Sequence, residues 1–158
     1  MPSHTEIVAA LESEGLTLPE APKPVAAYVP WVRSGDLVFV SGQIPIRDGH
    51  IHAKGTIPSA TSLEEAQDAA RTCFLNGLAV LSSALDGDLG RVRRIVRLGV
   101  FVASDPGFTD QPKVANGASE LAVAVFGDDG RHARAAVGSI ALPLNSSVEV
   151  ELIAEVSG

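Results

Sequence analysis

Residues 132–156, which read HARAAVGSIALPLNSSVEVELIAEV, decide the fold more than any other part of the chain. A long uncharged stretch follows Arg134, and Pro143 and Asn145 then supply the residue types that favour a turn. A valine-rich segment with alternating acidic residues comes next. We therefore predict two strands joined as a hairpin at the end of the domain.

The second arm of this hairpin has two unlike faces, because successive side chains of a strand point to opposite sides of a sheet. The apolar face carries Val148, Val150 and Leu152, and the other face carries Glu149, Glu151 and Ile153. On a hairpin, Arg134 and Glu149 can meet on neighbouring strands. A guanidinium beside a carboxylate can bind a small anion and handle a water molecule or a proton. The alternative is an ion pair on the solvated face of the sheet.

Composition limits the class of protein. With 158 residues, of which 46% are hydrophobic, residues 1–158 suit one domain with a substantial core. Aromatic residues make up only 4% and the formal charge is −7, so a nucleic-acid partner is not expected.

The sequence shows no targeting leader and no apolar run long enough for a membrane span, so we expect a cytoplasmic protein without a membrane partner. The one cysteine, Cys73, excludes an internal disulfide and is interpreted as buried packing.

Two capping boxes mark the starts of helices. The box at Ser3 predicts a short helix that ends near Gly15, and a proline-rich connector completes residues 1–24, ahead of a core over residues 25–156. The box at Ser62 predicts the longest helix, from residue 63 to about 85. Further elements are a hairpin turning at residues 34–36, a turn at 48–49, a strand over 91–104 and a helix over 110–126.

This order of elements predicts an α+β fold with helices packed on one face of a mixed sheet. The opposite face remains apolar in segments such as VFVSGQIPI, residues 38–46. A soluble monomer rarely exposes so much apolar surface, and a closed homo-oligomer would cover it.

Four segments together resemble the Rid (reactive intermediate deaminase) superfamily, also called YjgF-type or L-PSP endoribonuclease proteins. They are Tyr28 with LVFVSGQIP (37–45), RVRRIVRLGVFVAS (91–104), FTDQPKVANGASELAVAVFG (108–127), and HARAAVGSIALPLNSSVEVELIAE (132–155). The resemblance covers nearly the whole chain from about residue 25 onward. It implies a chorismate-mutase-like fold of the bacillus type, a homotrimer, and ligand clefts between adjacent subunits. The activity it implies is hydrolysis of 2-imino acids or their enamine tautomers to 2-oxo acids and ammonia, with no metal and no organic cofactor.

The resemblance also implies roles for particular residues. Arg134 matches the arginine that grips the substrate carboxylate, and Glu149 matches the glutamate that positions the attacking water. The expected substrate-binding residues are Tyr28, Ser41, Gly42, Asn116 and Ala136, with Gly42 and Ala136 acting through their backbones. The Asn116 match needs a one-residue insertion before Arg134. We expect shared sites, with Arg134 and Glu149 on one subunit and Tyr28 or Asn116 supplied by its neighbour.

Some features of the sequence differ from those of the compact deaminases, so functions other than imine hydrolysis are also considered. The N-terminal helix, a long segment over residues 48–61, and Leu144-Asn145 where Lys-Gly is common indicate a longer, divergent subfamily. One alternative is a non-catalytic protein that binds small carboxylates or acts like a chaperone. Another is an endoribonuclease, which rests on the older family name and on the arginine cluster at residues 91–97. His50 and His52 are interpreted as loop histidines and not as metal ligands, and Ser41 has no neighbouring histidine to make it a nucleophile.

Overall fold

The computed structural model describes residues 1–23 and 27–158 and is built around a five-stranded sheet. The elements in chain order are α1 (His4–Ser13), β1 (Trp31–Ser34), β2 (Leu37–Gln43), β3 (Ile46–Arg47), β4 (His50–Ile51), α2 (Leu63–Ala84), η1 (Leu89–Arg91), β5 (Val92–Ala103), α3 (Gln111–Phe126), η2 (Gly127–Gly130), β6 (Ala133–Ser139), η3 (Pro143–Asn145) and β7 (Val148–Val156). The strand order is β1-β2-β7-β5-β6, and β3 and β4 form a separate two-stranded hairpin.

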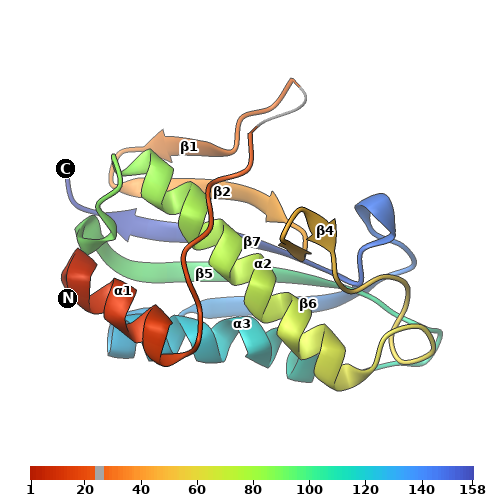
Figure 1. Cartoon of the computed structure of the whole chain (residues 1–158). Helices are drawn as coiled ribbons and strands as arrows, with labels where there is room; N and C mark the ends of the chain where they lie inside the picture. The colour runs from red at the N-terminus through yellow and green to blue at the C-terminus, as the bar shows by residue number, and fades with distance from the viewer. Residues whose placement is uncertain (24–26) are drawn as a thin grey trace.

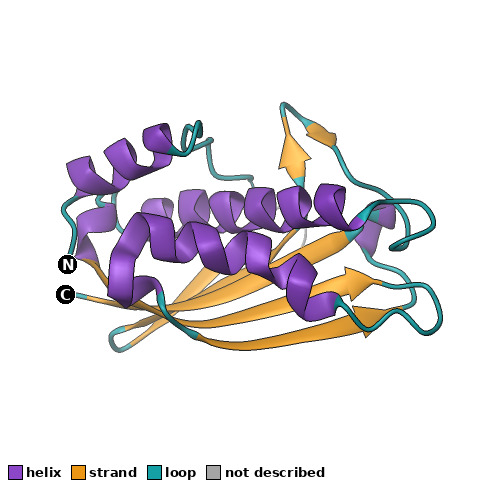
Figure 2. Ribbon diagram, turned by 90° about the horizontal axis from the view of Figure 1, so that it is seen from below, coloured by secondary structure: helices purple, strands orange, loops and turns teal. Residues whose placement is uncertain are grey.

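The helices lie on one face of the sheet, as predicted (Figures 1 and 2). α2 and α3 pack side by side over the strands, and α1 contacts α3 and η1 at one end. Along β7, every second residue from Val148 to Val156 is buried, which confirms the alternation predicted for this segment. Leu152 packs against α2 at Gly77, so the apolar face of β7 is the face that the helices cover. The mixed α+β class is therefore confirmed.

Both capping boxes form. At Ser62 the hydroxyl accepts the Glu65 N–H at 3.1 Å and the Ser62 N–H donates to the Glu65 carboxylate at 2.8 Å. The same exchange joins Ser3 and Glu6 at the start of α1. Each box satisfies backbone donors that a helix leaves without partners, which explains why these local signals predicted the helix starts well.

Cys73 is fully buried in α2, as predicted. Its thiol donates to the Val148 carbonyl oxygen at 3.7 Å. Burial raises the pKa of the thiol well above its usual value, and the charge of Glu149 raises it further. The side chain therefore remains a protonated packing group.

The predicted C-terminal hairpin is wrong. β6 and β7 are not neighbours, because β5 lies between them, pairing parallel with β6 and antiparallel with β7. α3 carries the chain back along the sheet after β5, so β6 runs in the same direction as β5 at the sheet edge. The segment through η3 then crosses the end of β5 to start β7 on its other side.

The N-terminal hairpin forms around the predicted turn but begins later than expected. Residues 24–26, which include the predicted start of its first arm at residue 25, lie outside the described residues. β1 starts at Trp31, directly after Pro30, and it is an edge strand. The turn at Asp48-Gly49 is confirmed and joins β3 to β4, with both residues at positive φ.

The face of the sheet opposite the helices carries exposed apolar side chains beside charged ones such as Glu149 and Glu151. Val32, Phe39 and Val137 are 52%, 41% and 47% exposed there. In the register of the sheet, Val32 pairs with Phe39, and Phe39 pairs with Ile153 of the central strand β7. Across residues 1–23 and 27–158, no helix has the length and apolar character needed to cross a bilayer.

Candidate functional site

Arg134 extends from the edge strand β6 onto the side of α3. Its Nη1 donates to Asn116 Oδ1 at 2.9 Å and to Ser119 Oγ at 3.1 Å, and its Nη2 donates to the Pro112 carbonyl oxygen at 3.3 Å. A guanidinium has five N–H donors. Within residues 1–23 and 27–158, these contacts therefore leave the Nε–H and one Nη2–H of this exposed side chain for a ligand. Two adjacent donors on a fixed plane suit a carboxylate.

His132 continues this chain of contacts. Its Nδ1 lies 2.6 Å from the Gly130 carbonyl oxygen, which can only accept, so Nδ1 carries the proton in the neutral ring. Its Nε2 then accepts from the Ser119 hydroxyl at 2.9 Å, and Ser119 Oγ accepts from Arg134. Burial lowers the pKa of His132, and the charge of Arg134 lowers it further against the opposite effect of Gly130. We call Arg134, Asn116, Ser119 and His132 the arginine half-site.

Glu149 lies on β7 and points away from the helices, because its neighbours in the strand face the core. Its carboxylate packs against Gly42 so closely that a Cβ at that position would overlap Oε1. Burial raises the pKa of this half-buried carboxyl, and the nearby Glu151 carboxylate raises it further. Glu149 can therefore take up and release a proton closer to neutral pH than an ordinary glutamate can.

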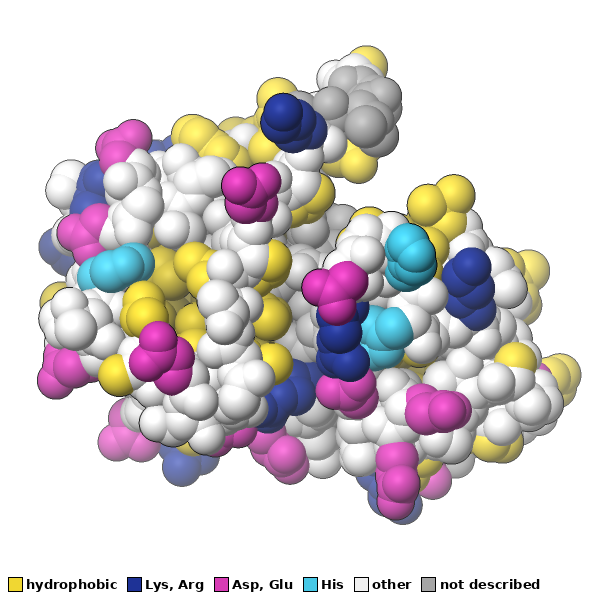
Figure 3. All heavy atoms as spheres, viewed as in Figure 1, with side chains coloured by type: hydrophobic (Ala, Val, Ile, Leu, Met, Phe, Trp, Pro, Cys, Tyr) yellow, Lys and Arg dark blue, Asp and Glu magenta, His cyan; other side chains and the backbone are white. Residues whose placement is uncertain are grey.

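Ser41 fixes the segment that carries Tyr28. Its hydroxyl donates to the Val29 carbonyl oxygen at 2.8 Å, and its backbone N–H donates to the Pro30 carbonyl oxygen at 2.9 Å. We call Glu149, Gly42, Ser41 and Tyr28 the glutamate half-site. All four line a cavity of about 710 Å³. Its mouth opens on the face shown in Figure 3, between the connector after α1 and the lobe that carries the β3–β4 hairpin.

The prediction that Arg134 and Glu149 lie on neighbouring strands of one chain is wrong. In the register of the sheet, Arg134 pairs with Leu98 of β5, whereas Glu149 pairs with Phe101 on the other side of β5. Two strand spacings and three residues of rise separate them by about 14 Å. They also point to opposite faces, since Arg134 contacts α3 and Glu149 faces away from it. One chain therefore holds two separate half-sites.

The other predicted residues divide between these half-sites. Asn116 contacts Arg134 within the same chain, in spite of the insertion between them. Tyr28, Ser41 and Gly42 lie with Glu149. Ala136 lies one β-period after Arg134, and its side chain packs against the core.

Ser119 and His132 were not predicted, although two periodicities point to them. Ser119 lies three residues after Asn116, on the same side of α3. His132 precedes Arg134 by two residues, the spacing that places both side chains on one face of an extended segment. Neither spacing identifies a contact with Arg134 unless α3 is known to lie beside β6.

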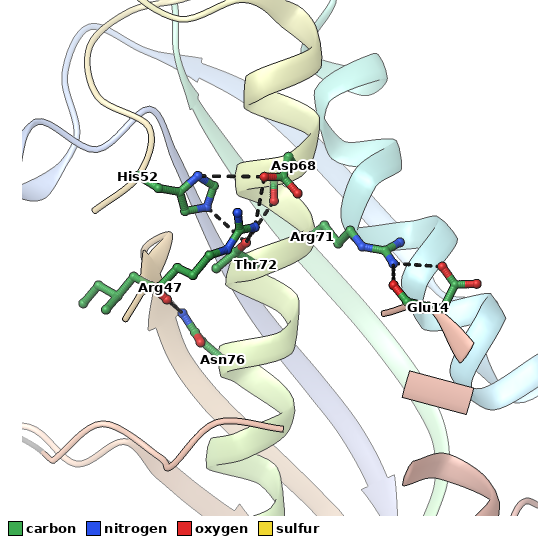
Figure 4. Close-up of polar contacts among 8 residues, drawn as sticks. Glu14, Arg47, His52, Asp68, Arg71, Thr72 and Asn76 are labelled. Atoms are coloured by element: carbon green, nitrogen blue, oxygen red, sulfur yellow. Dashed lines mark hydrogen bonds and ion pairs between the residues drawn. The ribbon is translucent and has the colours of Figure 1, made fainter. Parts of the chain in front are cut away.

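The histidine and arginine clusters noted in the sequence take part in protein contacts. His52 Nε2 lies 3.0 Å from Thr72 Oγ1, to which Arg47 also donates at 2.7 Å (Figure 4). Burial and the charge of Arg47 lower the pKa of His52, and Asp68 opposes them. Within the described residues, no group of three His, Cys, Asp or Glu side chains could hold a metal ion.

Three arginines of the cluster at residues 91–97 form ion pairs. Arg91 lies 3.6 Å from Asp86, Arg93 lies 3.8 Å from Glu155, and Arg97 lies 3.1 Å from Glu151. These carboxylates reduce the positive potential that a phosphate backbone would need.

Comparisons with known proteins agree with this architecture. The model of one family, described as "YjgF/chorismate_mutase-like, putative endoribonuclease", matches residues 6–156. Protein TCP17 of Trypanosoma cruzi is 45% identical over 152 residues, which are 96% of this chain and 94% of that protein. A 2-iminobutanoate/2-iminopropanoate deaminase of Dermatophagoides farinae is 28% identical over 138 residues, covering 87% of this chain and 92% of that one.

A solved structure shares the fold closely. It is a protein of unknown function from Agrobacterium tumefaciens, 45% identical, with a TM-score of 0.93 over 98% of this chain and 94% of that one. Together with the family match over residues 6–156, this similarity settles the assignment suggested by the motifs. The chain belongs to the YjgF/chorismate mutase-like family.

Proposed function

We propose that this protein hydrolyses 2-imino acids and their enamine tautomers to 2-oxo acids and ammonia, at sites assembled between the subunits of a homotrimer. The observation that carries the proposal is the pair of complementary half-sites, one with two arginine donors left for a carboxylate and one with a glutamate of raised pKa. The deaminase of Dermatophagoides farinae supports the reaction class. The proposed reaction needs no metal and no organic cofactor.

The arginine half-site binds the substrate. The two remaining donors of Arg134 hold the substrate carboxylate, and the contacts with α3 fix the guanidinium beforehand. Less side-chain entropy is then lost on binding, and the C=N carbon is held at a defined place. In this proposal, backbone N–H groups near Gly42 and Ala136 stabilise charge that develops during attack.

Glu149 of the adjacent subunit performs the proton transfers of the reaction. Its carboxylate takes a proton from water while the water oxygen bonds to the carbon of the protonated imine. The resulting carbinolamine receives that proton on nitrogen, its hydroxyl proton passes to Glu149 as the C–N bond breaks, and ammonia leaves. Glu149 then gives up this second proton to the ammonia or to solvent, which restores the carboxylate. A carboxyl whose pKa is raised toward neutrality suits this exchange in both directions.

The uncovered sheet face supports the assembly. Val32, Phe39 and Val137 form apolar surface that a closed ring of subunits would bury. The half-sites of one chain face different sides of the sheet, so a site that contains both needs a second copy of the chain.

The test couples an L-amino-acid oxidase, which makes the imine, to detection of the 2-oxo acid. We expect the protein to accelerate imine decay, and Arg134→Ala to lower kcat/KM by about 100-fold because a charged contact to the carboxylate is lost. The matched control is Arg131→Ala, which removes an exposed arginine paired with Asp128 outside both half-sites. Imine decay that the protein never accelerates, with small carboxylates still bound, would indicate the non-catalytic carboxylate binder.

A further inference from the structure

The cavity at the glutamate half-site extends well beyond the residues that the proposed reaction uses. Its volume of about 710 Å³ lies in the range of pockets that enclose a drug-sized ligand. A four-carbon imino acid would leave most of this space unfilled. The chemical character of the remaining walls therefore indicates what kind of group fills this space.

Those walls are mainly apolar. They come from the connector after α1, from α2, and from the chain between β2 and β3, and they include Leu16, Pro19, Pro22, Ile44, Ile46 and Leu75. The charged lining residues are Glu20 and Lys23, which are exposed residues of the connector, Arg47 and Asp48, which belong to the β3–β4 hairpin, and Glu149, which lies on β7.

Two polar side chains in the α2 wall are engaged with the protein. The Asn76 side-chain amide donates to the carbonyl oxygens of Ile44 and Ile46 at 3.2 and 3.0 Å, and Thr72 contacts Arg47 and His52 (Figure 4). These contacts use both N–H donors of the Asn76 amide and the hydroxyl of Thr72 within the fold. This wall therefore favours an apolar group over a polar one.

Exposed apolar side chains also gather around this cavity. Tyr28, Ile46 and Leu144 all line it, yet they are 57%, 38% and 73% exposed. Apolar side chains that surround a cavity and remain open to solvent are typical of a ligand site.

Leu144 provides a separate observation. Its backbone has a φ of 54°, in the left-handed region that leucine disfavours and glycine adopts easily. The fold thus keeps a large apolar side chain at the cavity although a glycine would suit the backbone better. Strained residues of this kind cluster at binding sites.

From these observations we infer that the substrate is a 2-imino acid with a bulky apolar side chain, branched aliphatic or aromatic. The side chain occupies the cavity between the connector and α2, while the carboxylate lies at Arg134 and the C=N carbon lies at Glu149. This inference rests on the proposed function, because it assigns the substrate class of the same site.

The experiment compares imino acids made by amino-acid oxidase from alanine, leucine and phenylalanine. We expect kcat/KM for the leucine or phenylalanine imine to exceed that for the alanine imine by about 10-fold or more, because extra methylene groups enter an apolar pocket. An alanine imine hydrolysed as well as the other two would overturn the inference.

A pair of variants locates the effect. Leu144→Gly removes apolar surface from the cavity and relieves the backbone, so the preference for phenylalanine imine over alanine imine should fall by about 4-fold or more. Ile140→Gly is the matched control, since Ile140 is 95% exposed in the same connection and does not line the cavity. If this preference falls equally in both variants, or falls in neither, the assignment is contradicted.

Binding of the stable 2-oxo acids separates this inference from the proposed reaction. Isothermal titration of the wild-type protein with pyruvate and phenylpyruvate needs no turnover. Tighter binding of phenylpyruvate supports the cavity assignment even if no imine is hydrolysed, which would refute only the deaminase activity. Equal or weaker binding of phenylpyruvate refutes the cavity assignment, whatever the kinetics give.

Discussion

At the scale of single residues, Ser119 links a histidine to the arginine of the proposed site. A hydroxyl donates one hydrogen bond and accepts others. Here it donates to His132 Nε2 and accepts from Arg134 Nη1, so the tautomer of His132 sets the orientation of the Ser119 hydroxyl. We therefore propose that Ser119 and His132 are positioning residues that fix Arg134 before a ligand binds.

Loss of this link should weaken substrate binding and leave the chemical step intact. Ser119→Ala removes one of the contacts to Arg134, worth about 1 kcal/mol, so we expect KM to rise about 5-fold with kcat nearly constant. His132→Leu should have a similar effect, whereas His132→Gln, whose side-chain oxygen can accept from Ser119, should restore much of the loss. Steady-state kinetics on the imine measures this split.

A double variant provides the control. With Ser119→Ala already present, His132→Leu should raise KM no further, because its effect passes through the hydroxyl. Independent effects of the two substitutions, or a fall in kcat alone, would contradict the positioning role.

At the scale of elements, the arginine half-site depends on the position of α3, because Asn116 and Ser119 of this helix contact Arg134. Gly117 allows α3 to pack closely against α2. Gly117 contacts α2 so closely that a Cβ would overlap the backbone carbonyl oxygen of Gln67. Gln67 also donates to the Lys113 carbonyl oxygen at 2.9 Å. The backbone of a neighbouring helix cannot move aside as a flexible side chain can.

Gly117→Ala therefore tests packing against helix propensity. Propensity alone predicts a gain of about 1 kcal/mol for alanine in a helix interior. The overlap with α2 should outweigh it, and we expect a net loss of about 1 kcal/mol or more in the free energy of unfolding. Urea denaturation measures the change, and Ala124→Gly at an exposed position of α3 calibrates propensity on the same helix. A more stable Gly117→Ala variant would show that the close approach does not constrain α3.

The elements also show what the sequence could predict. The starts of α1 and α2 were predicted correctly because a capping box acts within a few residues, as at Ser62. The faces of β7 were predicted correctly because alternation is local as well. The position of β6 was not, because strand order depends on the long pairing of β5 with β7, which no local signal encodes. The contact between Arg134 and α3 could not be predicted for the same reason.

At the scale of the whole molecule, we propose that each site combines the arginine half-site of one subunit with the glutamate half-site of another. The sequence motifs indicated the residues, but the prediction that Arg134 and Glu149 lie on neighbouring strands is wrong because β5 separates them. The fold of one chain keeps the two groups apart, and in the proposed assembly a second copy brings them together while it buries the exposed apolar side chains of the sheet.

Hybrid oligomers test this claim most directly. Arg134→Ala and Glu149→Gln proteins, each inactive alone, are unfolded, mixed in equal amounts and refolded together. In a closed ring each site draws its halves independently from two subunits, so about a quarter of the sites should be intact and about a quarter of wild-type activity should return. The same proteins refolded separately and then mixed without exchange should remain inactive. Hybrids as inactive as the separate variants, when size measurements show mixed oligomers, would contradict a site shared between subunits.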